Sequence, residues 1–460
     1  MSKPVIHRIN GYTILFIKSK SKTVYVSSII ANGYCNERES DIGINHLLEH
    51  VLFESWKKCK QESCELYWMS KPVFFNGFTT MTQMKYFIDG MSHELPGMLE
   101  YIIDVTTHPR ILQKTLTTGK KIIVNEMNLR INSSDYGFNQ VALNALYTLP
   151  GLQQSNNYLL QKKNIENISL QDLVDYLKKN YTPSNTYFFV SGDFNPTNVL
   201  SVFKKKLTAS SSSSSVGSDS NIPSKSPFSY QPKLFFVKNK TDEASNSGGV
   251  YFNIFFPMDI YINNELLQYL LITCNIVEKE LYNILRVDHK LVYSIFVKYA
   301  TYYYGTVIEI TGSCTNSNLV KILQFIVAYL REKKTKYVDQ KILNNAKKLL
   351  LLDRYNHIKN PMEIAEFYES QYLLNEMQER HRGRDKSKEK EEQEQEEEEE
   401  EEEEHKKTVC KIYSEIEFDK ILETINVKHI QMIINMIDFG AIIIGYMGKK
   451  NLHLNLSDFI

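Results

Sequence analysis

The stretch His46-Leu47-Leu48-Glu49-His50 decides how this chain is interpreted. Side chains four residues apart lie on one face of a helix, one turn apart, so both histidines can reach one metal ion. Glu49 lies three residues after His46 on the same face, where it can hold a water molecule beside the metal. Zinc favours neutral imidazole and carboxylate ligands, and a catalytic site keeps one position open for water. The pentapeptide therefore predicts a zinc site in which Glu49 accepts a proton.

An exposed helix with two solvated histidines is the alternative interpretation, and the flanking residues argue against it. These are mostly apolar: Ile42, Ile44, Leu47, Leu48, Val51, Leu52 and Phe53. A helix with so many apolar residues is largely buried, and buried polar groups need partners. A bound metal ion supplies that partner for the two imidazoles.

A metal site of this kind needs a third protein ligand, and Glu126 is the candidate downstream. The segment from Lys114 to Arg130 is predicted to be a helix, with Ile123 and Met127 among its apolar positions. A glutamate on a partly buried helix face is usually exposed or part of an ion pair. Periodicity alone therefore does not make Glu126 a ligand.

The order H-x-x-E-H, a long gap and then a glutamate in a helix resembles the pitrilysin/insulinase family of zinc metallopeptidases. The short two-domain, mitochondrial-processing-peptidase-like members are the most similar type. The gap from His50 to Glu126 is 76 residues (126 minus 50), which is similar to that family. The resemblance implies that His46, His50 and Glu126 hold one zinc ion per chain. It also implies that Glu49 is the general base.

The segment Asn76-Gly77-Phe78-Thr79-Thr80 is similar to the Asn-Ala-x-Thr-Ser segment of the same family. In the family this segment is a strand beside the zinc that pairs with extended substrate. The resemblance therefore implies substrate-binding roles for Asn76, Gly77 and Thr79. Taken alone, Asn76-Gly77 is equally compatible with a turn.

Arg286 and Tyr293, seven residues apart, resemble the Arg/Tyr pair of the family. In relatives this pair faces the zinc from another domain and helps bind substrate and the tetrahedral intermediate. Singly, Arg286 could be a solvated helix residue and Tyr293 a core aromatic. The family assignment depends on their order and spacing together with the zinc motif.

One position departs from the family pattern. The family usually carries a second glutamate seven residues before the ligand glutamate, and this chain has Gly119 there. Such a carboxylate orients metal ligands and tunes metal affinity. A glycine also weakens a helix by about 1 kcal/mol relative to alanine.

Composition excludes several other classes of protein. The chain has 460 residues, of which 42% are hydrophobic and 23% charged, and its formal net charge is zero. This favours an ordinary globular protein and gives no reason to expect nucleic acid or a membrane as partner. We find no transmembrane segment, signal peptide or transit peptide, which predicts a cytoplasmic protein. Six scattered cysteines predict no disulfide framework, and Cys59 and Cys64 are a poor structural zinc site.

The pattern of strands and helices predicts an α+β protein with two similar domains of the family's α/β-roll type. We expect a zinc-peptidase domain at residues 1–207, a Ser-rich flexible linker at 208–229 and a second domain at 230–460. A low-complexity charged insertion, which ends in an unbroken run of glutamates, falls at about 378–407. It could dock basic partners, but a tolerated surface insertion is the simpler account.

Together these features predict a zinc-dependent metalloendopeptidase that hydrolyses extended peptides or unfolded protein segments. Relatives of this size build a chamber from four domains, which implies a homodimer or a heterodimer. The alternative is a non-catalytic scaffold or regulatory subunit that keeps the peptidase fold. Such members typically lose the zinc residues, whereas His46, Glu49, His50 and Glu126 are all present here. A purely structural zinc site fits poorly, because such sites usually have four ligands rich in cysteine.

Overall fold

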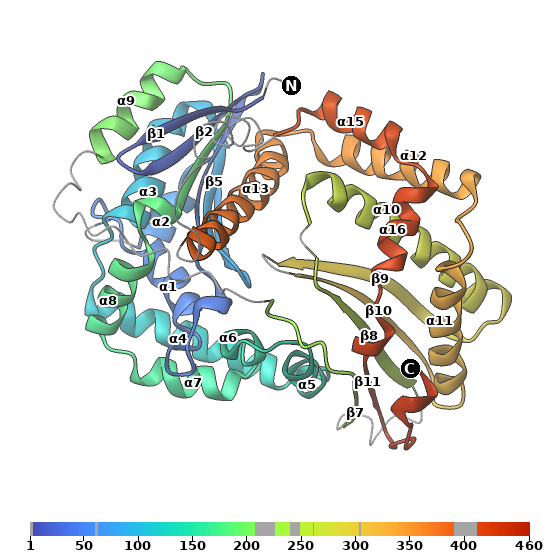
Figure 1. Cartoon of the computed structure of the whole chain (residues 1–460). Helices are drawn as coiled ribbons and strands as arrows, with labels where there is room; N and C mark the ends of the chain where they lie inside the picture. Colours follow the sequence, from blue (N-terminus) through green and yellow to red (C-terminus); the bar gives the residue numbers. More distant parts are fainter. Residues whose placement is uncertain are drawn as a thin grey trace. The chain divides into compact units, whose positions relative to one another are not determined.

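The computed structural model describes residues 3–59, 63–207, 226–239, 249–260, 262–302, 305–390 and 412–460, with side chains given up to residue 376 in the long helix that ends at 390. It divides into two compact units (Figure 1). The first consists of Met1–Ser133, Leu149–Pro223 and His357–Glu369, and the second of Ser134–Thr148, Ser224–Asn356 and Ser370–Ile460. Each unit combines one mixed sheet with several helices, so the predicted α+β class is confirmed.

The first unit is built on a six-stranded sheet in the order β1-β2-β6-β3-β5-β4. The strands are β1 (Val5–Ile9), β2 (Tyr12–Lys18), β3 (Thr23–Ile30), β4 (Val73–Thr79), β5 (Met84–Met91) and β6 (Thr186–Gly192). Strands β2 and β6 are parallel, and the other neighbours are antiparallel. Strand β4 is the outermost described strand on its side of the sheet, which leaves one of its edges without a strand neighbour.

The helices of the first unit bury their apolar residues against this sheet. They are α1 (Ile44–Phe53), α2 (Cys64–Met69), α3 (Leu95–Thr107), α4 (Gln113–Ile131), α6 (Pro150–Gln153), α7 (Tyr158–Asn167), α8 (Leu170–Asn180) and α9 (Pro196–Leu207). Helix α3 contacts β3 and β5, while α1 contacts β4, β5 and α4. One continuous core results, which includes Leu47, Val51, Trp68 and Ile123.

The second unit has a five-stranded sheet in the order β7-β11-β8-β10-β9. Its strands are β7 (Lys233–Lys238), β8 (Gly249–Met258), β9 (Val292–Tyr302), β10 (Gly305–Thr315) and β11 (Ile443–Gly448). The longer helices are α5 (Tyr136–Leu146), α10 (Asn264–Leu281), α11 (Leu319–Lys333), α12 (Gln340–His357), α15 (Glu415–Thr424) and α16 (Val427–Asn435). Helices α10, α11 and α16 pack together, and α10 also contacts β9.

Two segments belong to a unit that is distant from them in the sequence. Helix α5 contacts β7 and β11 of the second unit. The start of α13 (Pro361–Lys390) joins the first unit, where Glu369 Oε2 lies 2.7 Å and Glu366 Oε1 lies 3.1 Å from Nζ of Lys85. Lys85 is a β5 residue with a side chain only 3% exposed, so these two carboxylates neutralise a buried charge.

Parts of the predicted linker and insertion lie outside the described residues. Of the predicted linker at 208–229, only 226–229 is described. Helix α13 continues through the first part of the insertion to Lys390, and the glutamate run lies beyond the described residues. Among the helices that can be described, none has the length and apolar character needed to cross a bilayer.

One cysteine pair differs from the sequence-based expectation. Cys59 and Cys64 are disulfide-bonded, with their Cα atoms 5.4 Å apart. No disulfide framework was expected from the sequence, and this single pair among the described cysteines was not predicted. Their spacing gave no sign of it, because two cysteines five residues apart come close only when the chain turns between them.

Candidate metal centre

Helix α1 presents the two histidines at the edge of the core. Its apolar residues Leu47, Leu48, Val51 and Leu52 are fully buried. The histidines lie on a different side of the helix and keep part of their surface exposed, 19% for the side chain of His46 and 22% for that of His50. The predicted helical spacing is therefore present, and both imidazoles can be approached by a metal ion.

A buried carboxylate holds the start of this helix. Glu37 Oε2 accepts a hydrogen bond from the backbone N–H of Gly43 at 3.0 Å, and its Oε1 accepts one from Asn45 at 3.0 Å. Gly43 itself has a φ of 96°, a conformation that favours glycine. Burial raises the pKa of Glu37 to about 8, although the two backbone hydrogen bonds oppose this shift. Glu37 therefore satisfies backbone donors that the first turn of any helix leaves unpaired.

Glu126 of helix α4 completes a group of three potential metal ligands. Its Oε2 lies 3.4 Å from Nε2 of His46, and its Oε1 lies 3.7 Å from Nε2 of His50. One ligand atom from each residue can be chosen so that all three lie within 4.8 Å of one another. Two imidazoles and a carboxylate at this separation suit zinc, whose ligands bind at about 2.0–2.2 Å in tetrahedral geometry.

The protonation preferences of these groups also suit a metal. Burial, together with the adjacent His46 ring, lowers the pKa of His50. A hydrogen bond with His46 lowers the pKa of Glu126. Neutral imidazole and ionised carboxylate are the forms that bind a metal ion. The chemistry of the donor set therefore fits zinc.

Gly119, which stands where the family pattern has a glutamate, lies on the side of α4 that packs against α1. A Cβ atom added there would be 3.0 Å from Cγ2 of Val51 and 3.9 Å from Cβ of His50. Gly119 and Glu126 are seven residues apart, two helical turns, and so share one face of α4. The glycine thus permits a close helix–helix contact beside the ligand group.

Glu49 is held in place by strand β4. The hydroxyl of Thr79 donates a hydrogen bond of 2.8 Å to Glu49 Oε2. Because Glu49 is on α1 with His46 and His50, its carboxylate lies beside the ligand group without belonging to it. Thr79, predicted to bind substrate, is thus placed to position Glu49.

The other two predicted substrate-binding residues lie on the same edge strand. The side chain of Asn76 is exposed, and its Oδ1 accepts a hydrogen bond from the N–H of Gly77. Any side chain at Gly77 would meet Phe53 of α1, because a Cβ atom would lie 2.8 Å from the ring. Asn76-Gly77 is therefore part of strand β4 and not a turn.

Arg286 and Tyr293 belong to the second unit. Arg286 lies in a π-helical segment, η7 (Tyr282–Asp288), and its Nη1 donates a hydrogen bond of 3.0 Å to the carbonyl of Val292. Tyr293 follows directly on β9 and is 60% exposed, so it is not a core aromatic. π-Helical turns occur frequently at functional sites.

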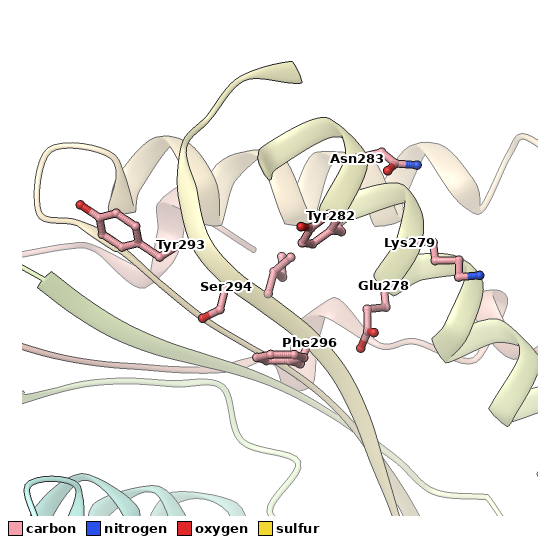
Figure 2. Close-up of a pocket in the computed structure, with 8 residues that line it drawn as sticks. Glu278, Lys279, Tyr282, Asn283, Tyr293, Ser294 and Phe296 are labelled. Carbon is pink, nitrogen blue, oxygen red and sulfur yellow. The ribbon is translucent and has the colours of Figure 1, made fainter. Parts of the chain in front are cut away.

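Tyr293 also lines a cavity of about 360 Å³ between α10, η7 and β9 (Figure 2). The other lining residues are Glu278, Lys279, Tyr282, Asn283, Ser294, Ile295 and Phe296. The Tyr293 hydroxyl points away from the other labelled side chains in Figure 2. Its phenol is therefore available to a group outside this cavity.

One residue of the centre, Glu37, and one contact, between Thr79 and Glu49, were not predicted from the sequence. Glu37 lies six residues before Gly43, and Glu39 and Asp41 follow it closely, so the sequence does not show which of these acidic residues folds back onto Gly43. The hydrogen bond between Thr79 and Glu49 joins residues thirty positions apart (79 minus 49), so no local pattern reveals it.

Comparison with known proteins gives a family from the sequence and a shared fold from the structure. The description "Insulinase (Peptidase family M16)" matches residues 13–148, and "Peptidase M16 inactive domain" matches residues 167–350. The beta subunit of mitochondrial-processing peptidase from Rattus norvegicus is 28% identical over 173 residues, which are 37% of this chain and 35% of that protein. Cytochrome b-c1 complex subunit 1 from Mus musculus is 23% identical over 220 residues, 47% of this chain and 44% of that protein. These alignments span less than half of each relative.

Solved structures share the fold over nearly the whole chain. A protease from Helicobacter pylori has a TM-score of 0.71 at 15% identity, with 97% of this chain and all of that chain (100%) covered. A peptidase M16 inactive domain from Pseudomonas fluorescens has a TM-score of 0.72 at 12% identity, covering 97% of this chain and 98% of that one. At such identities the likeness concerns the fold. With family matches in both halves of the sequence, the predicted resemblance is confirmed: the chain belongs to the insulinase family of peptidases, family M16.

Proposed function

We propose that this protein is a zinc-dependent metalloendopeptidase that cleaves extended peptides or unfolded protein segments. The observation that carries the proposal is the arrangement of His46, His50 and Glu126 within 4.8 Å of one another, with Glu49 held beside them by Thr79. Three protein ligands and one open position are typical of catalytic zinc sites, whereas structural sites use four.

His46, His50 and Glu126 would hold the metal. When bound, zinc supplies Lewis acidity, which polarises the scissile carbonyl and makes a water molecule more acidic. Glu49 accepts the proton of the attacking water and then delivers it to the nitrogen of the leaving amine. The hydrogen bond from Thr79 to Oε2 leaves Oε1 of Glu49 available for this transfer.

Strand β4 would bind the substrate. Its outer edge has no strand neighbour among the described residues, and its exposed Asn76 lies on the same strand as Thr79. An extended peptide can add to such an edge through backbone hydrogen bonds, a mode that reads the backbone more than the side chains. This supports peptides or unfolded segments as the substrate class.

Arg286 and Tyr293 would bind the substrate and the tetrahedral intermediate. Both are exposed, and both carry hydrogen-bond donors that can stabilise an oxyanion. In a dimer of this chain, or in a complex with a related subunit, these residues would serve the metal centre of the other chain. Subunits of multi-protein assemblies among the relatives support an oligomer.

A paired assay tests the proposal. Wild type and Glu49→Gln are purified, their zinc content is measured, and each is incubated with a mixture of unfolded peptides. We expect about one zinc ion per chain in both proteins and cleavage only by wild type, because glutamine cannot accept the proton. Glu39→Gln removes an exposed carboxylate outside the centre and is the matched control, which should cleave like wild type. Cleavage by Glu49→Gln at the wild-type rate would contradict the mechanism.

A non-catalytic subunit is the second candidate. The match of residues 167–350 to an inactive peptidase domain and the glycine at position 119 favour it. In that case wild type would bind zinc and the peptides, and neither it nor Glu49→Gln would cleave them.

A further inference from the structure

The disulfide between Cys59 and Cys64 lies at the end of the helix that carries the metal-centre histidines. Cys59 is partly exposed in the loop after α1, and Cys64 is the fully buried first residue of α2. Three other described cysteines, Cys35, Cys274 and Cys314, are buried and not disulfide-bonded. Cys59 is thus the more accessible residue of the pair, and Cys64 is shielded within the core.

We infer that Cys59 and Cys64 are a reversible redox pair, a site that exchanges with small disulfides and thiols and controls how firmly helix α2 supports strand β4. The redox part concerns chemistry outside the peptidase reaction. The effect on substrate rests on the proposed function, since it treats β4 as the peptide-binding strand.

The surroundings of Cys59 favour thiol–disulfide exchange. Cys59 is partly exposed and follows the exposed residues Lys57 and Lys58, of which Lys58 forms an ion pair with Glu100. Exchange requires that a sulfur atom be accessible to the attacking reagent. Cys274 and Cys314 differ, because burial raises the pKa of each of these thiols to about 12. Cys59 is therefore better placed than these two thiols to react first.

Oxidation of the reduced pair by a small disulfide takes two steps. The Cys59 thiolate attacks one sulfur of a small disulfide, which forms a mixed disulfide and releases one small thiol. The Cys64 thiolate then attacks the Cys59 sulfur, which closes the protein disulfide and releases the second small thiol. The two protein thiols lose two electrons and two protons, and the small disulfide gains them.

Helix α2 is tied to the end of α1 by a carboxylate as well as by the disulfide. Glu54, the residue after α1, accepts hydrogen bonds from the backbone N–H of Cys64 at 2.9 Å and from the hydroxyl of Ser63 at 3.0 Å. Glu54 lies four residues after His50. Reduction would leave α2 attached by Glu54 and by packing, which allows its first turn more freedom.

An aromatic cluster connects α2 with the substrate strand. Trp68 of α2 stacks on Trp56, with ring centroids 5.7 Å apart, and contacts Tyr101 at 5.2 Å. Tyr101 contacts Phe75 of β4 at 6.3 Å, and its hydroxyl donates a hydrogen bond to the carbonyl of Phe53 at the end of α1. Movement of α2 is therefore transmitted to β4 two residues before Gly77.

The first test follows the disulfide itself. The full chain is equilibrated in mixtures of reduced and oxidised glutathione and digested with trypsin after thiols are blocked. Cleavage after Lys58, Lys60 and Lys85 separates Cys59-Lys60 from the peptide 61–85, because trypsin does not cleave the Lys71–Pro72 bond. These two fragments stay linked only in the oxidised protein. The chain has two tryptophans, Trp56 and Trp68, so indole emission reports on this cluster alone.

We expect the linked peptide to form and disappear reversibly as the ratio of oxidised to reduced glutathione is changed. The tryptophan emission should change in parallel. Cys59→Ser and Cys64→Ser should abolish both responses, and Cys274→Ala, which removes a buried thiol elsewhere, should leave both intact. A pair that never links, or that links without reversal, would overturn the inference.

The second test measures peptide cleavage by the oxidised and reduced protein. We expect reduction to raise KM several-fold while kcat and zinc content stay unchanged, because the substrate strand loosens and the metal ligands do not. A reversible disulfide with an unchanged KM would overturn the coupling to β4. If neither form cleaves peptide, affinity for the same peptides replaces KM; a several-fold loss on reduction then upholds the inference while the peptidase proposal fails.

Discussion

At the scale of single residues, the chemistry depends on side chains that never touch the metal. Glu49 can act only if its carboxylate points toward the ligand group, and Thr79 supplies the described side-chain hydrogen bond that holds it. The role of Thr79 is therefore positioning, and it can be separated from metal binding.

Thr79→Val keeps the shape of the side chain and removes its hydroxyl. Hydrogen bonds to charged groups are worth about 1.5–3 kcal/mol, so we expect kcat to fall roughly ten- to a hundredfold. Zinc content and KM should stay close to wild type. Steady-state kinetics and metal analysis measure these effects, with the exposed Thr197→Val as control. A loss of zinc with unchanged kcat per bound metal would refute the positioning role.

Glu37→Gln tests how the start of the metal-binding helix is held. The amide can accept a hydrogen bond from only one of the two N–H groups of Gly43 and Asn45, which leaves a buried donor unpaired at a cost of about 1–3 kcal/mol. We expect lower stability toward urea and weaker zinc binding, with Glu39→Gln unaffected.

The pH dependence of this effect has a definite sign. Burial raises the pKa of Glu37 from 4.5 to about 8 in the folded protein. Between these values the folded state binds more protons at this group than the unfolded state, so its contribution to stability is present below pH 4.5 and is lost as the pH rises to 8. The difference in unfolding free energy between wild type and Glu37→Gln should therefore shrink over this interval. A constant difference would contradict the raised pKa.

At the scale of elements, the contact between α1 and α4 sets the distances within the ligand group. Gly119→Ala should strengthen α4 by about 1 kcal/mol in helix propensity. It should also push α4 away from Val51, since the new Cβ atom would lie 3.0 Å from a buried methyl group. The higher helix propensity stabilises the protein and the close contact destabilises it, so we expect little change in the unfolding free energy.

Zinc affinity should respond differently, because displacement of α4 moves Glu126 away from the histidines. We expect weaker zinc binding in a competition assay with a chelator. The double variant Gly119→Ala/Val51→Ala removes the close contact and should recover much of the affinity. Equal weakening in the single and double variants would show that the contact is not the cause.

The sequence predicted the elements that are long and periodic. The helix that carries His46 and His50 was expected, and the helix with Glu126, expected at Lys114–Arg130, is observed at Gln113–Ile131. The predicted grouping of His46, His50 and Glu126 rested on family resemblance, since helical periodicity gives no distance between α1 and α4. The Cys59–Cys64 disulfide and the close packing at Gly119 were not predicted, because both depend on tertiary approach that a local pattern does not record.

At the scale of the whole molecule, the residues proposed for catalysis are divided between the two units of the chain. Arg286 and Tyr293 lie in the second unit, and the proposed ligands lie in the first. If the protein is a homodimer in which each chain supplies Arg286 and Tyr293 to its partner, two different inactive chains should complement each other.

Mixing Glu49→Gln with Tyr293→Phe, after dissociation and reassembly, tests this arrangement. A mixed dimer would contain one site with both Glu49 and Tyr293 intact, so we expect activity to reappear. With random assembly, half of the dimers are mixed, and each mixed dimer has one intact site of two. The activity should therefore approach a quarter of the wild-type value. Peptide cleavage by the mixture and by each variant alone measures this. Mixtures as inactive as their components would exclude a homodimer with shared sites.

The salt bridges between Lys85 and the start of α13 also bear on how the chain is made. Strand β5 is synthesised early, yet the carboxylates of Glu366 and Glu369 that neutralise its buried Lys85 come about 280 residues later (366 minus 85 is 281, and 369 minus 85 is 284). Until the ribosome has passed Glu369, the sheet of the first unit holds an uncompensated cation. The nascent first unit must therefore wait in an incomplete form, and closing so long a loop makes the final step slow compared with the local folding of its helices.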